Sequence, residues 1–337
     1  MSSEGAASTR SPSIYDVARA AGVSASTVSR ALSKPGRVSF DTAEHIRTVA
    51  ARLGYRATPT RRSIEDNRSQ TLAMMVADIT NPVFFGMIRG AERTAMHAGY
   101  TLVLVESQES EETEKEALER ILPTVAGVIL TSSRMADGPI RTLAKRTPVV
   151  VLNRLVDQVP SVTCDNIKAM KRVVEHLARL GHRSLTYLGG PDASWANGQR
   201  WRGVLEAGHD LDIVVRRLGP FLPTINGGRQ AAAKWANART SAVVSYNDLM
   251  AIGFLEATTE AGLQVPRDTS VVGFDNIRDS TLVRPQLTTV ASPLVSLGSA
   301  AVNHLLKTSI IPVRRNNLVV LPARVMVRES SGPAHRR

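Results

Sequence analysis

The chain has 337 residues and a formal net charge of +12 at pH 7, with 42 Lys and Arg residues against 30 Asp and Glu residues. With 43% hydrophobic and 21% charged residues, the composition is that of a globular protein with more than one domain, which excludes a disordered or fibrous chain. The basic balance favours a polyanionic partner such as nucleic acid.

The first twelve residues predict a small, polar tail without the apolar stretch of a signal peptide, so we expect a cytoplasmic protein. Three short amphipathic helical patterns follow within residues 13–57. Ser13, Ser24 and Ser39 stand where each helix would be capped, and Gly22 separates the first two helices. A short second helix after a glycine turn predicts a helix-turn-helix unit for DNA binding.

The second helix of this unit is the one that would enter the major groove. Arg30 is the side chain best suited to bidentate pairing with guanine, whereas Ala25 offers only an apolar contact, for example to a thymine methyl group. The helical pattern alone leaves open a small helical bundle with solvated arginines. We predict base readout by Ala25, Ser26, Ser29 and Arg30, and phosphate contacts from Tyr15, Ser24, Thr27, Ser39 and Thr42.

The next segment, residues 58–70, is polar and basic and predicts a linker or a marginal helix. Beyond it, short apolar runs alternate with amphipathic helical patterns, which predicts a parallel sheet with helices on both faces. Strands spread over about 260 residues exceed one compact unit, so we expect two α/β halves. The predicted strands are Thr71–Val76, Thr101–Val105, Gly127–Leu130, Pro148–Leu152, Leu185–Leu188, Ser241–Val244 and Ser270–Phe274.

Residues 14–32, IYDVARAAGVSASTVSRAL, resemble the DNA-binding headpiece of the LacI/GalR family of bacterial transcriptional regulators. Further family landmarks follow in order, among them DITNP at 78–82, YNDLMA at 246–251 and VGFD at 272–275. Their joint order is specific and extends the resemblance over essentially the whole chain. It implies an α/β protein with an all-α helix-turn-helix headpiece and a periplasmic-binding-protein-like core of two doubly wound parallel-sheet subdomains.

The resemblance also implies where the domains begin and end. The expected parts are a disordered tail at 1–12, the headpiece at 13–57, a hinge helix or linker at 58–70 and an effector-binding and dimerisation core at 71–330. Within the core we expect an N-subdomain at about 71–165 and 292–322 and a C-subdomain at about 166–291 and 323–330.

Members of this family fold the linker into a hinge helix on operator DNA and insert a leucine into the minor groove. Here Ile64 stands at the position of that leucine, and Arg61 and Arg62 would follow the phosphates or a narrow minor groove. Pro59 near the helix start and Arg61 in place of a small residue depart from the family pattern. A disordered basic linker that bends DNA less than is usual for the family is the alternative.

The resemblance places an effector site outside the carboxyl ends of the strands. Asn residues, an Asp, an Arg and aromatic rings suit a neutral polyol or a nucleoside. Most of these positions also have a structural alternative: strand-end turns or helix caps for the Asn and Asp residues, the core for the aromatic residues, and a surface ion pair for the Arg. The predicted effector residues are Phe84, Thr131, Asn153, Arg200, Phe221, Asn247 and Asp275.

The chain lacks the glycine-rich nucleotide-binding motifs and the Gly-x-Ser-x-Gly elbow, so we expect no enzyme and no cofactor. The spacing of its histidines and its single cysteine predict no metal site, and Cys164 is expected to be a small buried hydrophobic residue. We also expect Asp165 and Asn166 to be structural.

These observations predict a cytoplasmic, nucleoid-associated, homodimeric transcriptional repressor without a membrane partner. It would bind a pseudo-palindromic operator, with an affinity controlled by a sugar, nucleoside or purine-like effector. Two alternatives remain: a regulator that needs its ligand as corepressor, and a sugar-binding interaction protein that has lost DNA binding.

Overall fold

The structure, a computed structural model, describes residues 12–33, 38–53, 55, 69–308 and 318–335. The chain divides into two compact units, residues 1–68 and 69–337. None of the helices in the described ranges is both long enough and apolar enough to cross a membrane.

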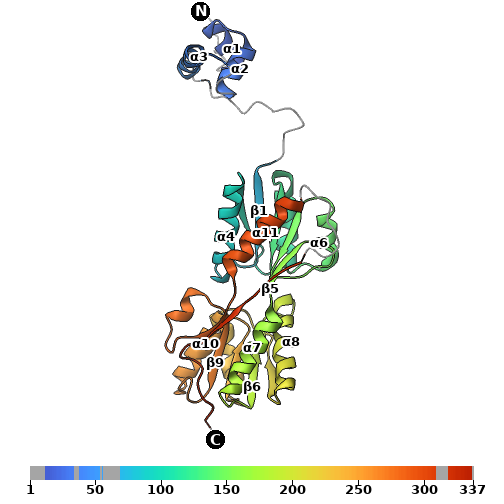
Figure 1. The fold of residues 1–337 in the computed structure, drawn as a ribbon, viewed down its shortest axis with the longest axis vertical. Coiled ribbons are helices and arrows are strands. Elements are labelled where there is room, and N and C mark those ends of the chain that lie inside the picture. Colours follow the sequence, from blue (N-terminus) through green and yellow to red (C-terminus); the bar gives the residue numbers. More distant parts are fainter. Residues whose placement is uncertain (1–11, 34–37, 54, 56–68, 309–317, 336–337) are drawn as a thin grey trace, which may run out of the picture. The chain divides into compact units, whose positions relative to one another are not determined.

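The first unit is a bundle of three short helices (Figure 1). Val17, Val28 and Ile46, one from each helix, are fully buried at its centre. They lie on the apolar faces that the sequence predicted, so the three-helix interpretation is confirmed. The helices are α1 (Ile14–Ala21), α2 (Ala25–Ser33) and α3 (Phe40–Arg52).

The first half of the second unit, the N-subdomain, is a six-stranded parallel sheet covered on both faces. Its strands lie in the order β11 (Leu318–Leu321), β5 (Ser161–Cys164), β4 (Val149–Leu152), β3 (Gly127–Thr131), β1 (Thr71–Val76) and β2 (Thr101–Glu106). Met74 packs with helices α4 (Val83–His97) and α11 (Leu294–Thr308), whereas Met75 packs with α5 (Glu111–Ile121) and α6 (Asp137–Ala144). Neighbouring side chains of one strand thus belong to cores on opposite faces.

The second half, the C-subdomain, contains a sheet with one antiparallel edge pair. Its strands lie in the order β12 (Arg324–Met326), β10 (Thr288–Ala291), β9 (Ser270–Asp275), β8 (Ala242–Ser245), β6 (Ser184–Leu188) and β7 (Val214–Leu218), and only β12 runs antiparallel to its neighbour. Helix α7 (Asn166–Arg179) packs on α8 (Trp195–Asp210), and α9 (Ile225–Trp235) packs on α10 (Asp248–Glu260). The central strands β8 and β9 are buried along their whole length.

The described chain passes between the two sheets three times: from β5 to β6, from β10 to β11 and from β11 to β12. The carboxyl ends of the two sheets approach each other at these passages, because Cys164 Sγ at the end of β5 lies 3.9 Å from Ser292 Oγ just after β10. Cys164 is buried, as expected from the sequence. The fold therefore gathers strand ends from both sheets around one region (Figure 1).

The seven strands predicted from apolar runs are all present, with ends that shift by one residue at most. Five further strands were not predicted from the sequence. Strand β7, for example, lies at a sheet edge and carries Arg216 and Arg217, so it lacks a continuous apolar run. The other missed strands, each of three or four residues, are β5, β10, β11 and β12.

Candidate functional site

The headpiece has the geometry of a helix-turn-helix. Gly22 ends α1 with φ 67° and ψ 27°, a left-handed conformation that residues with a side chain adopt only at a cost. The Ser24 hydroxyl accepts a hydrogen bond from the backbone N–H of Thr27, so Ser24 caps α2 as predicted. Ser39 precedes α3, but its hydroxyl bonds to the Thr42 hydroxyl and makes no cap bond to the helix backbone.

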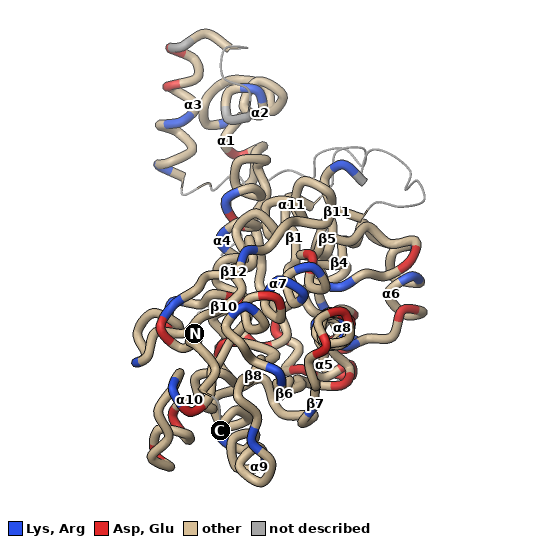
Figure 2. Tube along the Cα trace, turned by 60° about the horizontal axis from the view of Figure 1, so that its bottom comes forward, with Lys and Arg blue, Asp and Glu red and all other residues tan. Residues whose placement is uncertain are grey.

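The polar residues predicted to contact DNA lie on the surface of the headpiece or are half-buried there. Arg30 is exposed on α2, and its Nε donates to the Ser26 carbonyl oxygen at 3.1 Å. Tyr15 is 69% exposed at the start of α1. Ala25, Thr27, Ser29 and Thr42 are half-buried, and Ser24, Ser26 and Ser39 are exposed. Figure 2 marks further basic positions on α3. The hinge predictions for Arg61, Arg62 and Ile64, and the departure at Pro59, lie outside the described residues.

Arg200 is the centre of the polar cluster at the strand ends of the core. It lies on α8 with 3% of its surface exposed, so the alternative of a surface ion pair is wrong. Its guanidinium donates to Asn166 Oδ1 at 3.0 Å, to the Tyr246 carbonyl oxygen at 2.5 Å and to Asp275 Oδ1 at 3.4 Å. Its central carbon lies 3.6 Å from the centroid of the Phe274 ring, a stacked cation–π contact.

Asp275 ends β9 in an unusual conformation, with φ 117° and 5% exposure. Such strain at a strand end is typical of functional sites. Burial raises the pKa of Asp275 to about 6, although the charge of Arg200 and its hydrogen bond act in the opposite direction. Asp248 is fully buried nearby, and burial together with the charge of Asp275 raises the pKa of this second carboxyl. Asp248 accepts hydrogen bonds from the Thr289 hydroxyl and the Ile277 N–H.

Asn247 directly follows Tyr246 of this cluster, and both Asn247 and Phe221 are buried. The Asn247 side chain caps α10 through the N–H of Met250 and donates to the Pro223 carbonyl oxygen, so the helix-cap alternative describes what it does in this structure. Phe221 lies in the same loop as Pro223 and is buried. Phe84 on α4 is also buried in the core. Effector contacts by these residues stay a prediction.

Two predicted residues lie at strand ends of the N-subdomain. Asn153 follows β4 with φ 62°, and its amide donates to the Ser132 hydroxyl at 3.0 Å, which ties the ends of β3 and β4 together. Thr131, the last residue of β3, is buried, and its hydroxyl has no hydrogen-bond partner among the residues that the structure describes. The buried hydroxyl of Ser245 at the end of β8 also has no hydrogen-bond partner within the described chain.

Three residues of the Arg200 cluster were not predicted as site residues: Asn166, Tyr246 and Phe274. Asn166 was expected to be structural, and it holds the Nε of Arg200. For Tyr246 and Phe274 the signal available in the sequence was their position at predicted strand ends, directly beside Asn247 and Asp275. Asn166 gave no such signal, because it follows β5, which the sequence did not predict. Over the ranges that the structure describes, no group of three or more His, Cys, Asp or Glu side chains is arranged to hold a metal ion.

Comparisons with known proteins match both parts of the chain. Residues 13–58 match the model for bacterial regulatory proteins of the lacI family, and residues 174–331 match the model for a periplasmic binding protein-like domain. Catabolite control protein A of Priestia megaterium is 31% identical over 94% of this chain and 98% of its own length. The HTH-type transcriptional repressor CytR of Escherichia coli K12 is 33% identical over 86% of this chain and 88% of its own length.

Solved structures are similar over nearly the whole chain. The lac repressor dimer bound to operator and the anti-inducer ONPF has a TM-score of 0.83 and 26% identity, over 96% of this chain and 100% of that chain. A complex of the transcriptional regulator CelR with cellobiose has a TM-score of 0.71 and 25% identity, over 95% of this chain and 100% of that chain. The predicted fold, a helix-turn-helix headpiece with a two-subdomain core, is confirmed.

The raised pKa of Asp275 predicts a pH-dependent stability. Because its pKa in the folded chain lies above the ordinary value of 3.8, this group stabilises the fold fully below about pH 4 and loses that contribution as the pH rises through about 6. Asp275→Asn removes the titration. We expect the free energy of unfolding of the original chain, relative to this variant, to fall by about 2 kcal/mol between pH 4.5 and 7.

Urea denaturation across this pH range measures the difference. Asp210→Asn, which neutralises an exposed carboxylate on α8, is the control for loss of one charge. A difference between the original chain and Asp275→Asn that does not vary with pH would show that Asp275 does not titrate in this range.

Proposed function

The chain belongs to the LacI family of bacterial regulatory proteins, and from this premise we propose that it is a transcriptional repressor whose affinity for operator DNA is controlled by a small polyhydroxylated effector. The observation that carries the proposal is the buried Arg200–Asp275 pair at the strand ends of a core that is joined to a helix-turn-helix headpiece. Its relatives are transcriptional regulators. We propose that the chain acts by binding and not by catalysis, in the cytoplasm and on the nucleoid.

The headpiece would read DNA through α2. Arg30 and Ser26 lie one helical turn apart on an exposed face, which suits contacts to neighbouring base pairs. Arg30 donates two hydrogen bonds to Ser26, and exposed bonds of this kind are weak enough to be exchanged for a guanine edge. Ala25 and Ser29 complete the proposed base-reading surface. The phosphates would be contacted by Tyr15, Ser24, Thr27, Ser39 and Thr42. The minor groove would be entered by Arg61, Arg62 and Ile64.

The effector would bind where the strand ends of both sheets converge. A guanidinium has five N–H donors, of which three make the bonds described above, so Arg200 retains donors for a ligand oxygen. Asp275 would accept hydroxyl protons, and Asn153, Thr131 and Asn247 would add further polar contacts. Phe84 and Phe221 would cover the ring. The complexes of CelR with cellobiose and of a LacI family regulator with ribose support a sugar effector, and a nucleoside presents ribose hydroxyls as well.

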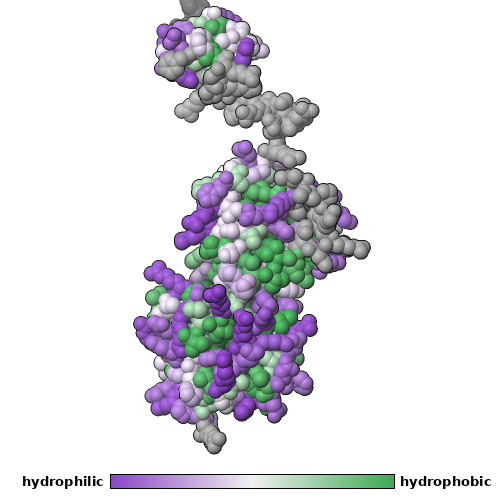
Figure 3. Space-filling model, viewed as in Figure 1, coloured by the Kyte–Doolittle hydropathy of each residue, from purple (hydrophilic) through white to green (hydrophobic). Residues whose placement is uncertain are grey.

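A second copy of the chain would pack on the edge of the N-subdomain formed by α4 and β2. Phe85 and Met96 are about three helical turns apart on one face of α4, and they are 55% and 58% exposed. Ile79 and Leu104 add exposed apolar surface beside them. Figure 3 shows hydrophobic residues among the polar ones on the face of the core that it presents. Exposed apolar surface next to an edge strand favours a dimer, and the similar lac repressor structure is that of a dimer.

Arg30→Ala tests the DNA-binding proposal. After selection of operator sequences from a random duplex library, the variant should lose about 1–3 kcal/mol of binding free energy and tolerate changes at one base pair per half-site. Fluorescence anisotropy with the selected operator and its single-base variants measures this. Arg47→Ala on α3 is a matched control, because it removes an exposed arginine outside α2. An equal loss on every sequence would make Arg30 a phosphate contact.

An effector screen tests the site in the core. Pentoses, hexoses, disaccharides and nucleosides would be added to the full chain, and a ligand at about 100 times its dissociation constant should stabilise the fold by about 2.7 kcal/mol, seen as a raised Tm. The stabilisation should disappear in Asp275→Asn and persist in Asp210→Asn. The same ligand should weaken binding to the selected operator. Tighter operator binding would instead show a corepressor.

Phe85→Glu tests the dimer surface. A charge in the centre of an apolar interface lacks a partner, so the variant should sediment as a monomer at concentrations where the original chain is a dimer. Leu205→Glu, at a 49% exposed apolar position on α8, is the matched control and should leave the dimer intact. A dimeric Phe85→Glu variant would exclude this surface, and a tetrameric original chain would contradict the proposed assembly.

A further inference from the structure

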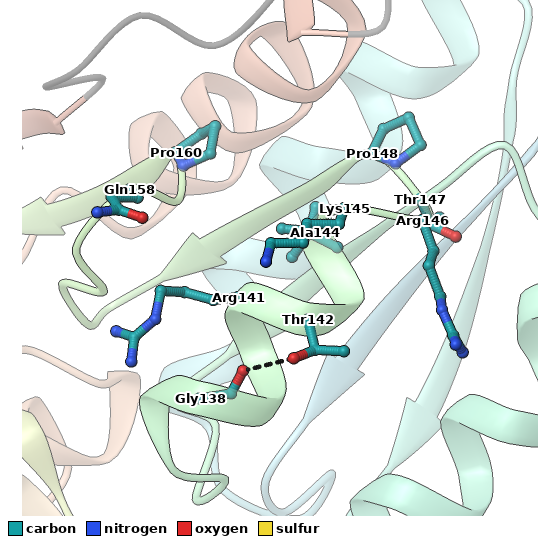
Figure 4. Close-up of a pocket in the computed structure, with 11 residues that line it drawn as sticks. Gly138, Arg141, Thr142, Ala144, Lys145, Arg146, Thr147, Pro148, Gln158 and Pro160 are labelled. Carbon is teal, nitrogen blue, oxygen red and sulfur yellow. Dashed lines mark hydrogen bonds between the residues drawn. The ribbon is translucent and has the colours of Figure 1, made fainter.

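A cavity of about 630 Å³ lies beside α6 at the amino ends of β4 and β5, at the opposite edge of the sheet from the strand ends described above (Figure 4). The wall on one side is α6 with the Thr147–Pro148 turn, and on the other side it is the chain at Gln158 and Pro160. Its size falls within the range of about 300–1,000 Å³ that is typical of small-molecule sites.

The cavity results from an unusually short connection. Parallel neighbours in a sheet are commonly joined by a dozen or more residues that include a helix. Only residues 153–160 join β4 to β5, and they form no helix. Val156 and Val159 of this connection pack into the core that contains Ile140 of α6. They fill only part of the space that a covering helix would occupy, so a hollow remains beside α6.

The lining of this hollow is cationic. It contains Arg141, Lys145 and Arg146 and no carboxylate. Arg141 lies 3.8 Å from Asp137, but that carboxylate is held more closely by Arg154 at 2.5 Å, so Arg141 is only weakly paired. Lys145 and Arg146 are exposed, and within the described ranges neither has a carboxylate at ion-pair distance. Cationic residues that line one cavity and lack close counter-charges favour an anionic ligand.

We propose that this cavity binds the phosphate ester of a small polar molecule, at a site separate from the effector region. Arg141 and Lys145, one helical turn apart, would hold the phosphate oxygens, and Arg146, whose side chain extends away from them in Figure 4, would add positive charge nearby. The Thr147 hydroxyl and the Gln158 amide face the same cavity and supply donors and acceptors for the organic part of the ester. The cavity has room beyond a bare phosphate, which favours an ester over the inorganic ion.

The position of the cavity in the sheet suggests how a bound ligand would affect DNA binding. The pairing of Leu72 with Gly127 and of Val128 with Val149 puts the amino ends of β1, β3 and β4 at one edge. Strand β1 follows the segment that joins the core to the headpiece. A bound dianion would therefore change the charge at the edge where that segment enters the core, and we expect it to alter affinity for DNA.

Isothermal titration calorimetry on the full chain tests this proposal. The probes are ribose 5-phosphate, glucose 6-phosphate and adenosine 5′-monophosphate, each beside its unphosphorylated parent, and inorganic phosphate. At least one ester should bind, and Lys145→Gln/Arg146→Gln should weaken its binding about tenfold or more, since one charge-assisted contact and one neighbouring positive charge are lost. Arg179→Gln/Arg183→Gln, a pair exposed on the C-subdomain, makes the same change in net charge and should have no effect.

Several results would overturn the proposal. Binding of no ester, equal binding of inorganic phosphate, or equal weakening by the control pair would show that no ester site exists here. Weakening by Asp275→Asn but not by Lys145→Gln/Arg146→Gln would move the ester to the effector region. Loss of operator affinity in Lys145→Gln/Arg146→Gln without any ester binding would assign these cations to the DNA backbone. Far-ultraviolet circular dichroism of each variant establishes that it is folded.

Discussion

The buried guanidinium of Arg200 is the constraint on which the arrangement of the strand ends depends. A charge taken out of water must be paired and hydrogen-bonded, or its desolvation destabilises the fold. The partners of Arg200 come from the start of α7, the end of β8 and the end of β9, and Phe274 stacks on it. These elements are separated in sequence, and the Arg200 side chain holds them together by hydrogen bonds.

The same side chain links the proposed effector site to the segments that cross between the subdomains. Asn166, the partner of the Arg200 Nε, lies two residues after the end of β5, where the chain crosses from the first sheet to the second. Cys164 at the end of β5 contacts Ser292, which lies in the segment that crosses back after β10. The 3.4 Å contact to Asp275 is the longest of the three bonds of Arg200 and the easiest for a ligand to replace. A ligand there acts where the crossing segments meet, and this position suits a change in the angle between subdomains.

The sequence predicted most of the fold but only part of the site, and the reason is physical. Central strands such as β1 and β4 are buried on both faces, so they appear as apolar runs, whereas edge strands such as β7 carry polar residues and give no such signal. The helix caps at Ser13 and Ser24 were predicted, because each depends on residues only three positions away in sequence.

The hydrogen-bond partners of Arg200 could not be predicted from the sequence, because they lie far away in sequence and meet only when the sheet forms. For Asn247 the sequence predicted the position at a helix start. A helix cap and a ligand contact use the same side-chain amide, however, so the sequence does not distinguish these two roles.

A parallel sheet also separates its two edges, and the N-subdomain uses both. The carboxyl ends of β3 and β4 present Thr131 and Asn153 to the proposed effector region, whereas the amino ends border the cationic cavity and the entry of the chain from the headpiece. The strands between them are short and fully buried, and a close-packed interior transmits strain from one edge to the other. Ligands at the two edges would then bias the same orientation of one subdomain. Their effects on DNA affinity would combine through a single equilibrium, with no need for a second switch.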